Sequence, residues 1–132
     1  EGAAYLHDIA GLRVVLSSVE AVYRFADILR ASPSWQFVCA RDYIAVPKKS
    51  GYRSLHMIVE VPIFLSNEKR YMRVEVQLRT IAMDFWASLE HKIRYKKNLS
   101  KERLDEIDKE LLECAKICKT LDEKMEEIKT GN

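Results

Sequence analysis

The stretch that decides the fold is RVEVQLR, residues 73–79, because apolar and polar side chains alternate along it without a break. This alternation predicts a β-strand whose apolar side, centred on Val76, faces a core. The other side carries a carboxylate, an amide and two guanidinium groups, spaced about 6–7 Å apart because each step spans two residues. A row of this composition is suited to hold a metal ion together with a polyphosphate. A solvated sheet face has the same pattern, so the strand alone leaves both interpretations open.

The overall composition is that of an ordinary soluble domain. The chain has 132 residues, of which 32% are charged and 48% hydrophobic, and its net charge is +2. This length suits one domain with a real core, and the small net charge gives no reason to expect a nucleic-acid partner. No apolar run approaches transmembrane length, so a membrane is not expected either. The odd count of three cysteines, without a CxxC pair, favours buried reduced thiols and a cytoplasmic protein.

Periodicity and turn signals divide the chain into seven elements. Thr80 is the predicted N-cap of the second helix. The order is strand, helix, three strands and two helices. It predicts an α+β fold in which helices flank a mixed sheet of four to five strands and a long helix ends the chain. Strands are predicted over residues 8–17, 35–46, 52–64 and 71–79, and helices over residues 19–30, 80–96 and 101–129.

The last predicted helix has a heptad pattern of its own. Its apolar residues alternate spacings of three and four over four heptads. The pattern fits packing against a helix of the same chain and packing against another subunit equally well. The residues of this pattern are Leu104, Ile107, Leu111, Cys114, Cys118, Leu121, Met125 and Ile128.

Two carboxylates are candidates for a metal site. Asp8 stands at the start of the first predicted strand and Glu75 in the middle of the fourth. If these strands are neighbours, the two carboxylates can share Mg²⁺, which prefers oxygen ligands and often retains waters and substrate phosphates. From spacing alone, a strand-start residue and a solvated glutamate are the simpler interpretation.

A second candidate site is the segment KKSGYRSLH, residues 48–56. Gly51 permits a close approach of the backbone to a ligand, and Lys48 supplies charge for phosphate. Tyr52 offers a ring on which a base can stack, a contact worth about 1–3 kcal/mol. His56 follows Tyr52 by four residues and is expected on the same strand face. A basic hairpin turn with a packed tyrosine is the plain alternative.

Arg13 interrupts an otherwise apolar strand. A buried guanidinium without a partner would be costly, so Arg13 is expected to face a ligand, a carboxylate or water. A structural salt bridge fits this position as well as a binding role does.

Four blocks that occur in order carry a resemblance to a known family. They resemble the synthetase domain of RelA/SpoT-homologue proteins, in particular the stand-alone small alarmone synthetases. The resemblance implies a nucleotidyltransferase-like fold and GTP pyrophosphokinase activity in the stringent response, in which pyrophosphate moves from ATP to the 3′-hydroxyl of GTP or GDP. The blocks are HDIAGLR (7–13), KKSGYRSLH (48–56), EVQLRT (75–80) and MDFWASLEHK (83–92).

The resemblance also implies roles for individual residues. Asp8 and Glu75 would be catalytic and bind Mg²⁺, with Glu75 also the base for the 3′-hydroxyl. Arg13 and Arg41 would contact ATP. Serine at position 50 departs from the asparagine of many relatives. The GTP or GDP site would consist of Lys48, Tyr52, His56, Gln77 and Asp84.

The resemblance further implies a division of the chain. Residues 1–99 would form the synthetase domain, without the family's N-terminal helices and the basic segment that they add to the ATP site. Residues 100–132 would form a C-terminal helix for packing or oligomerisation. Small members of the family are often oligomers, so a homo-oligomer, a tetramer or a dimer, is expected beside the partners ATP and GTP or GDP.

Two other functions fit the same residues. Toxin-like relatives use adenosine nucleotides or RNA ends as the acceptor, and the basic run from Lys92 to Arg103 keeps that possibility open. A truncated domain that binds guanine nucleotides without catalysis is the other.

Overall fold

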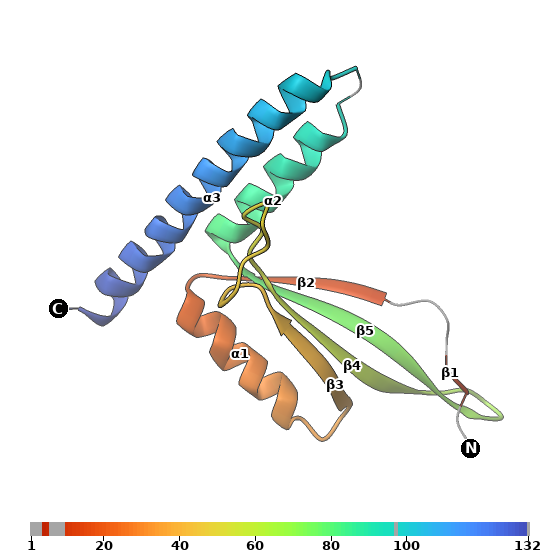
Figure 1. Ribbon diagram of the computed structural model, residues 1–132. Helices are drawn as coiled ribbons and strands as arrows, with labels where there is room; N and C mark the ends of the chain where they lie inside the picture. Colours follow the sequence, from red (N-terminus) through yellow and green to blue (C-terminus); the bar gives the residue numbers. More distant parts are fainter. Residues whose placement is uncertain (1–3, 6–9, 97, 132) are drawn as a thin grey trace.

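The computed structural model describes residues 4–5, 10–96 and 98–131 and forms five strands and three helices (Figure 1). The order along the chain has one helix after the second strand and two helices at the end. The strands are β1 (Ala4–Tyr5), β2 (Ala10–Leu16), β3 (Gln36–Asp42), β4 (Leu55–Phe64) and β5 (Lys69–Thr80). The helices are α1 (Val19–Ala31), α2 (Ile81–Arg94) and α3 (Lys101–Thr130).

Strand β5 organises the sheet. It pairs in antiparallel fashion with β4, which in turn pairs with β3. Its other edge pairs in parallel with β1 and then with β2, so these two short strands follow each other along one neighbour. The predicted α+β fold with a mixed sheet of four to five strands and a long C-terminal helix is confirmed.

One face of the sheet packs on α1 and forms the main core. Met57 of β4 and Leu78 of β5 are completely buried, as is Val22 of α1. Burying a side chain of this size stabilises the fold by about 1.5–3 kcal/mol. Because side chains alternate along a strand, the neighbours of these residues lie on the opposite face, which α1 leaves free. The candidate site residues of β4 and β5 belong to that opposite face.

Helix α2 follows β5 without a connecting residue. Thr80 ends the strand and caps the helix, since its hydroxyl accepts a hydrogen bond from the amide of Met83 at 3.2 Å. The N-cap predicted from the sequence is therefore confirmed. Helix α3 runs back alongside α2 (Figure 1), and the indole of Trp86 donates to the carbonyl of Leu111 at 2.8 Å. Among the described residues, no helix has the length and apolarity needed to cross a membrane.

The second and third predicted strands are shorter than expected. Strand β3 ends at Asp42 because Oδ1 of this residue accepts the amide hydrogens of Ile44 and Ala45, both at 2.9 Å, and turns the chain. The Tyr23 hydroxyl donates to the other carboxylate oxygen at 2.7 Å, and burial together with this carboxylate raises the pKa of Tyr23 to about 12. Residues 43–54 therefore form a loop, and Gly51 within it adopts a positive φ of 101°.

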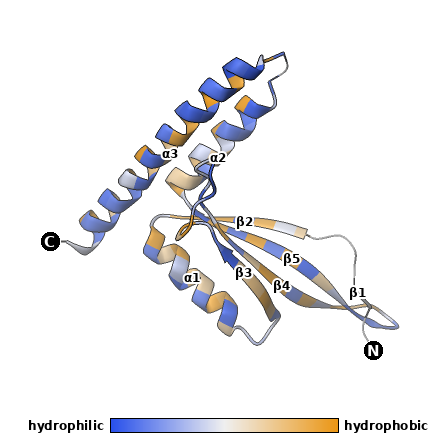
Figure 2. Cartoon of the chain, in the orientation of Figure 1, coloured by the Kyte–Doolittle hydropathy of each residue, from blue (hydrophilic) through white to orange (hydrophobic). Residues whose placement is uncertain are grey.

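Helix α3 does not follow its heptad pattern throughout. Leu111, Ala115 and Asp122 are its buried residues, at spacings of four and seven that a straight helix of 3.6 residues per turn brings to one side. The last heptad positions, Leu121, Met125 and Ile128, are exposed. Figure 2 shows a largely hydrophilic helix with apolar residues interspersed. The boundary predicted between residues 99 and 100 stays a prediction.

The expectation that the cysteines are buried was wrong. Cys39 and Cys114 are exposed, and only Cys118 is partly buried. Cys39 lies on the edge strand β3, and Cys114 lines an open cavity between α2 and α3 with Leu89 and Ile93. Burial raises the pKa of the Cys118 thiol.

Candidate active site

The sheet register assembles four of the predicted site residues into one row. Arg41 of β3 pairs with His56 of β4, His56 pairs with Gln77 of β5, and Gln77 pairs with Arg13 of β2. Each step between neighbouring strands is about 4.8 Å, so the backbones of Arg13 and Arg41 lie about 14 Å apart. The two arginines assigned to ATP thus occupy opposite edges of the row, with the two residues assigned to the guanine nucleotide between them.

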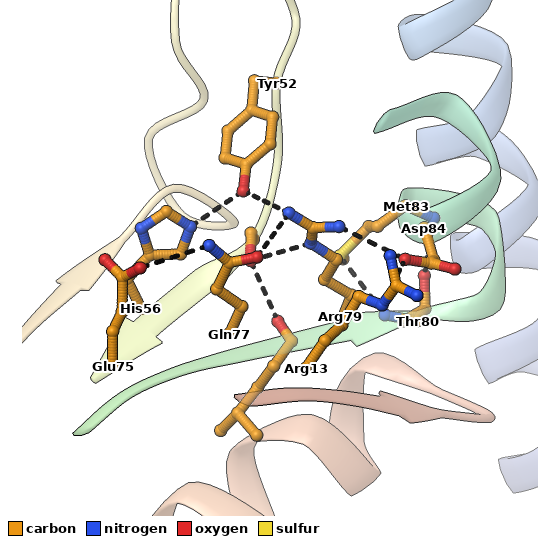
Figure 3. Close-up of polar contacts among 11 residues, drawn as sticks. Arg13, Tyr52, His56, Glu75, Gln77, Arg79, Thr80, Met83 and Asp84 are labelled. Atoms are coloured by element: carbon orange, nitrogen blue, oxygen red, sulfur yellow. Dashed lines mark hydrogen bonds and ion pairs between the residues drawn. The ribbon is translucent and has the colours of Figure 1, made fainter. Parts of the chain in front are cut away.

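Arg79 connects the residues above this row (Figure 3). Its Nη2 donates to the hydroxyl of Tyr52 at 2.7 Å and to Oε1 of Gln77 at 2.8 Å. Its Nη1 donates to Asp84 at 3.2 Å and its Nε to the hydroxyl of Ser54 at 3.4 Å. Only 8% of the Arg79 side chain is exposed, so these four bonds satisfy a buried charge. Arg79 holds the loop, the strand and α2 in one arrangement.

His56 and Tyr52 meet although Tyr52 lies before β4 begins. The Tyr52 oxygen is 2.8 Å from Nε2 of His56. The Tyr52 hydroxyl also accepts from Arg79, so one oxygen atom joins the guanidinium to the imidazole, and the tautomer of His56 sets which of the two groups donates in the bond between them. Burial lowers the pKa of His56, and the nearby charges of Arg79 and Lys48 lower it further, against the opposing effect of Glu75. The prediction that Tyr52 continues the strand was wrong, but the two side chains do share a site.

The ammonium group of Lys48 contacts two tyrosine rings of the same loop. It lies 4.8 Å from the ring centre of Tyr43 and 5.2 Å from that of Tyr52. Tyr43 in turn meets His56 edge to face at 5.2 Å. Such contacts between a cation and two rings favour a defined position for Lys48. The side chain of Lys48 thus lies beside the tyrosine ring that is the candidate base-stacking surface.

Glu75 lies two residues before Gln77 on β5 and on the same face. Gln77 donates to Oε1 of Glu75 at 3.3 Å, and this bond extends the chain of contacts that starts at Arg79. Glu75 pairs across the sheet with Gly11, and a Cβ placed on Gly11 would meet no atom of the described residues within 4 Å. The side chain of Glu75 is partly exposed, and a carboxylate of this kind can bind a hydrated Mg²⁺.

Asp8, the second predicted metal ligand, lies outside the described residues. The expected pairing of its strand with that of Glu75 is confirmed for residues 10–16. Within residues 10–96 and 98–131, no group of three or more His, Cys, Asp or Glu side chains could hold a metal ion. A divalent ion at Glu75 would therefore depend on Asp8, on water or on substrate phosphates for its other ligands.

Asp84 lies between two arginines at the start of α2. Besides Arg79, it contacts Nε of Arg13 at 3.5 Å, and 57% of the Arg13 side chain is exposed. The salt bridge that was one of the two interpretations of Arg13 is therefore present, and the rest of the guanidinium stays accessible. A cavity of about 470 Å³ opens beside these residues, a volume typical of small-molecule sites. It is lined by Arg13, Tyr52, Gln77 and Arg79 and by Ala87, Ser88, Glu90, His91 and Lys92 of α2.

Two residues of this arrangement escaped the sequence analysis. Arg79 is one of two arginines on the polar side of residues 73–79, and the alternation does not distinguish it from Arg73. Tyr43 was assigned to a strand, and the signal that could have identified it is Asp42, a residue type that often starts a turn. The contacts that make both residues important join segments distant in sequence.

Comparison with known proteins identifies the family. Residues 2–100 match the family described as the region found in RelA / SpoT proteins. The chain belongs to the RelA/SpoT family.

Two relatives from Bacillus subtilis illustrate how closely family members match. The chain is 47% identical to GTP pyrophosphokinase YwaC over 125 residues, which cover 95% of the chain and 59% of YwaC. It is 37% identical to GTP pyrophosphokinase YjbM over 124 residues, which cover 94% of the chain and 58% of YjbM. The chain therefore spans about three fifths of the length of these RelA/SpoT relatives.

Solved structures of family members share the fold. The small alarmone synthetase 2 of B. subtilis matches with a TM-score of 0.83 at 44% identity, over 92% of this chain and 65% of that one. The small alarmone synthetase 1 of the same organism, bound to its product pppGpp, matches with a TM-score of 0.82 at 35% identity, over 90% and 60%. The nucleotidyltransferase-like fold expected from the resemblance agrees with these matches.

Proposed function

We propose that the protein is a GTP pyrophosphokinase that transfers the β,γ-pyrophosphate of ATP to the 3′-hydroxyl of GTP or GDP. The observation that carries the proposal is the row of Arg41, His56, Gln77 and Arg13 across the sheet, with Glu75 next to it and Tyr52 above it. The arrangement places the carboxylate of Glu75 beside a row that has an arginine at each end. Relatives named GTP pyrophosphokinase, and a similar synthetase bound to pppGpp, support this assignment.

The acceptor nucleotide occupies the side of Tyr52. Its guanine base stacks on the Tyr52 ring, and Gln77 and Asp84 contact the nucleoside. His56 and Lys48 contact its phosphates, and Lys48 already lies beside the ring. Holding both nucleotides in one geometry accounts for much of the rate acceleration in such a transfer, because the translational and rotational entropy of bringing the reacting atoms together is lost on binding and not in the chemical step.

The ATP side is the edge formed by β2. Arg13 contacts the adenine of ATP, and Arg41 reaches the phosphates from the opposite edge. A similar synthetase has been solved with AMPCPP, an ATP analogue, bound. The transfer forms a bond between the 3′-oxygen and the β-phosphorus and breaks the bond between that phosphorus and the α,β-bridging oxygen, so AMP leaves.

Glu75 accepts the proton of the 3′-hydroxyl as the new bond forms. Its carboxylate is partly exposed, accepts a hydrogen bond from Gln77 and lies next to the polar row, across from Gly11. Glu75 and Asp8 would also hold Mg²⁺, which supplies neutralisation of the phosphate charge when it is bound.

The protein acts as a homo-oligomer in this proposal. Leu121, Met125 and Ile128 near the end of α3 are exposed together with Phe85 of α2. An exposed apolar group of this kind is typical of a subunit contact. The cytoplasmic location expected from the sequence stays a prediction.

The test of the proposed function is a transfer assay with the complete gene product. Incubation with Mg²⁺, ATP and GTP should yield pppGpp and AMP, and Glu75→Gln should abolish both products while the fold is retained. Parallel reactions with ATP alone and with tRNA test the adenosine and RNA acceptors. Product only in those reactions, or binding of GTP without any transfer, would replace the proposal by one of the two alternatives.

A further inference from the structure

Asp122 is a buried carboxylate on α3, far in sequence from the site. Only 5% of its surface is exposed. One oxygen, Oδ2, forms an ion pair with Nη2 of Arg53 at 3.0 Å and accepts a hydrogen bond from the hydroxyl of Thr80 at 3.0 Å. A single atom of the C-terminal helix therefore joins the loop before β4 to the end of β5.

Both partners of Asp122 adjoin residues that line the cavity at the proposed guanine-nucleotide subsite, Tyr52 and Arg79. Arg53 follows Tyr52 in the chain, and Thr80 follows Arg79. Thr80 also caps α2 and thereby fixes the first turn, in which Asp84 lies. A movement of either partner would displace a residue that lines the subsite.

Arg53 depends on Asp122 to an unusual degree. Its side chain is 6% exposed, and its Nε and Nη1 have no hydrogen-bond partner among the described residues. A buried guanidinium that loses its carboxylate partner must move toward water, because an unpaired charge in the interior is strongly unfavourable. Tyr52 is bonded to Arg53 through the backbone, so its ring would move as well.

The helix also shapes the loop on the other side of Tyr52. A Cβ on Gly51 would lie 2.6 Å from Cβ of Ala115, so loop and helix are in tight contact there. Ala115 and Asp122 both belong to the buried side of α3. Two contacts from one helix thus fix the residues before and after Tyr52.

We propose that Asp122 is a positioning residue for the guanine-nucleotide subsite, acting through Arg53 on Tyr52 and through Thr80 on the start of α2. This inference rests on the proposed function for the identity of the nucleotide. It makes α3 a structural part of the nucleotide site, beyond the packing or oligomerisation expected from the sequence.

The test is a double-mutant cycle in the complete gene product, with Asp122→Asn, Arg53→Gln and the double variant. Each single variant should raise KM for GTP at least fivefold, while KM for ATP and kcat change less than twofold. The double variant should raise KM for GTP about fivefold, well below the product of the single effects, because neither group then leaves a buried unpaired charge. Glu123→Gln, which removes a charge from the exposed neighbour of Asp122 on the same helix, should leave both KM values unchanged.

Several outcomes would overturn the inference. They are equal increases in KM for GTP and ATP, additive effects in the cycle, or an effect of Glu123→Gln as large as that of Asp122→Asn. If circular dichroism shows that the single variants do not fold, the double variant is compared with the wild type instead. Its KM for GTP should then rise about fivefold, while its KM for ATP and its kcat change less than twofold.

A second measurement separates this inference from the proposed function. Hydrogen exchange of the amides of residues 47–54 should be faster in Asp122→Asn than in Glu123→Gln, whether or not the protein transfers pyrophosphate. If the wild type makes no pppGpp but binds GTP, the dissociation constants for GTP replace KM in the cycle. Unchanged exchange in this loop would overturn the positioning role even in an active enzyme.

Discussion

Nη2 of Arg79 donates a hydrogen bond to the hydroxyl of Tyr52 at 2.7 Å. This bond joins the polar end of β5 to the loop that leads into β4. The same hydroxyl lies 2.8 Å from Nε2 of His56. One oxygen atom of the loop therefore connects a buried guanidinium of β5 to the imidazole of β4.

Replacing Arg79 by lysine should weaken binding of the guanine nucleotide. An ammonium group lacks the planar fork of arginine and cannot reach Tyr52, Gln77 and Asp84 together. We expect KM for GTP to rise tenfold or more, equivalent to about 1.4 kcal/mol, and the melting temperature to fall. Steady-state kinetics and thermal unfolding measure both. The matched control is Arg73→Lys on the same strand, where the arginine is exposed and should tolerate the change; a similar loss there would contradict the central position of Arg79.

Arg13 should affect ATP rather than GTP. The Arg13 side chain is 57% exposed in its ion pair with Asp84, and pairs at the surface contribute about 0–1 kcal/mol, so Arg13→Gln should leave the melting temperature almost unchanged. If Arg13 contacts adenine, KM for ATP should rise about tenfold and KM for GTP by less than twofold. Arg24→Gln, which removes an exposed arginine paired with Glu20 on α1, is the control. An unchanged KM for ATP in the Arg13 variant would exclude the contact with adenine, and the salt bridge with Asp84 would then be the role of Arg13.

The lowered pKa of His56 should make the free energy of unfolding depend on pH. Burial lowers the pKa of His56 in the folded protein below its ordinary value of 6.5. Between the folded and the unfolded pKa, the unfolded chain binds more protons, so the free energy of unfolding rises with pH in this window. His56 therefore contributes stability above pH 6.5 that is lost as the pH falls. Melting temperatures of wild type and His56→Gln between pH 5 and 8 should show a weaker dependence below about pH 6.5 in the variant; equal slopes would argue against a buried neutral His56.

Gly51 and Gly11 should respond in opposite ways to an added methyl group. Gly51→Ala combines a positive φ of 101° with a Cβ 2.6 Å from that of Ala115, and should destabilise the fold by about 1–3 kcal/mol. Adding Ala115→Gly should recover the steric part of this loss and leave the backbone strain. Gly11→Ala, where a Cβ meets no atom within 4 Å, is the control and should be close to neutral in urea unfolding. Equal losses at the two glycines would contradict the close contact of the loop with α3.

The exposed apolar end of α3 should govern association. Leu121→Glu together with Met125→Glu places two charges among apolar groups, and we expect a smaller molecular mass in light scattering coupled to gel filtration. Lys124→Glu, an exposed change on the same turns, should leave the mass unchanged. An unaltered molecular mass in the double variant would show that the subunit contact lies elsewhere or that the protein is a monomer.

Local patterns predicted most of the fold because each element has its own signal. The alternation in residues 73–79, the periodicity of residues 19–30 and the cap at Thr80 each define an element without reference to the rest of the chain. Predicted and observed ends differ where a side chain turns the backbone, as Asp42 does. The family blocks brought Glu75, Gln77, Tyr52 and His56 into one candidate site. The register places His56 beside Gln77, and a hydrogen bond joins Tyr52 to His56.

The contacts of Arg79 and Asp122 were beyond prediction for a physical reason. Each depends on which strands pair and on how far α3 rotates along its length. The heptad pattern predicts that Leu121 and Met125 lie on the buried side of α3. In the structure the second half of the helix buries a different side, which contains Asp122. An acidic residue one position from an apolar one looks like surface in the sequence. It becomes an anchor only when the neighbouring loop supplies Arg53.

The direct passage from β5 into α2 at Thr80 has a consequence for how this family can vary. One inserted residue between Thr80 and Asp84 would turn the rest of α2 by about 100° and carry Asp84 away from both arginines. One deleted residue would do the same in the other direction. Length changes in related proteins should therefore collect in the β4–β5 hairpin around residues 65–68 and be absent from the strand–helix junction, where spacing itself is under selection.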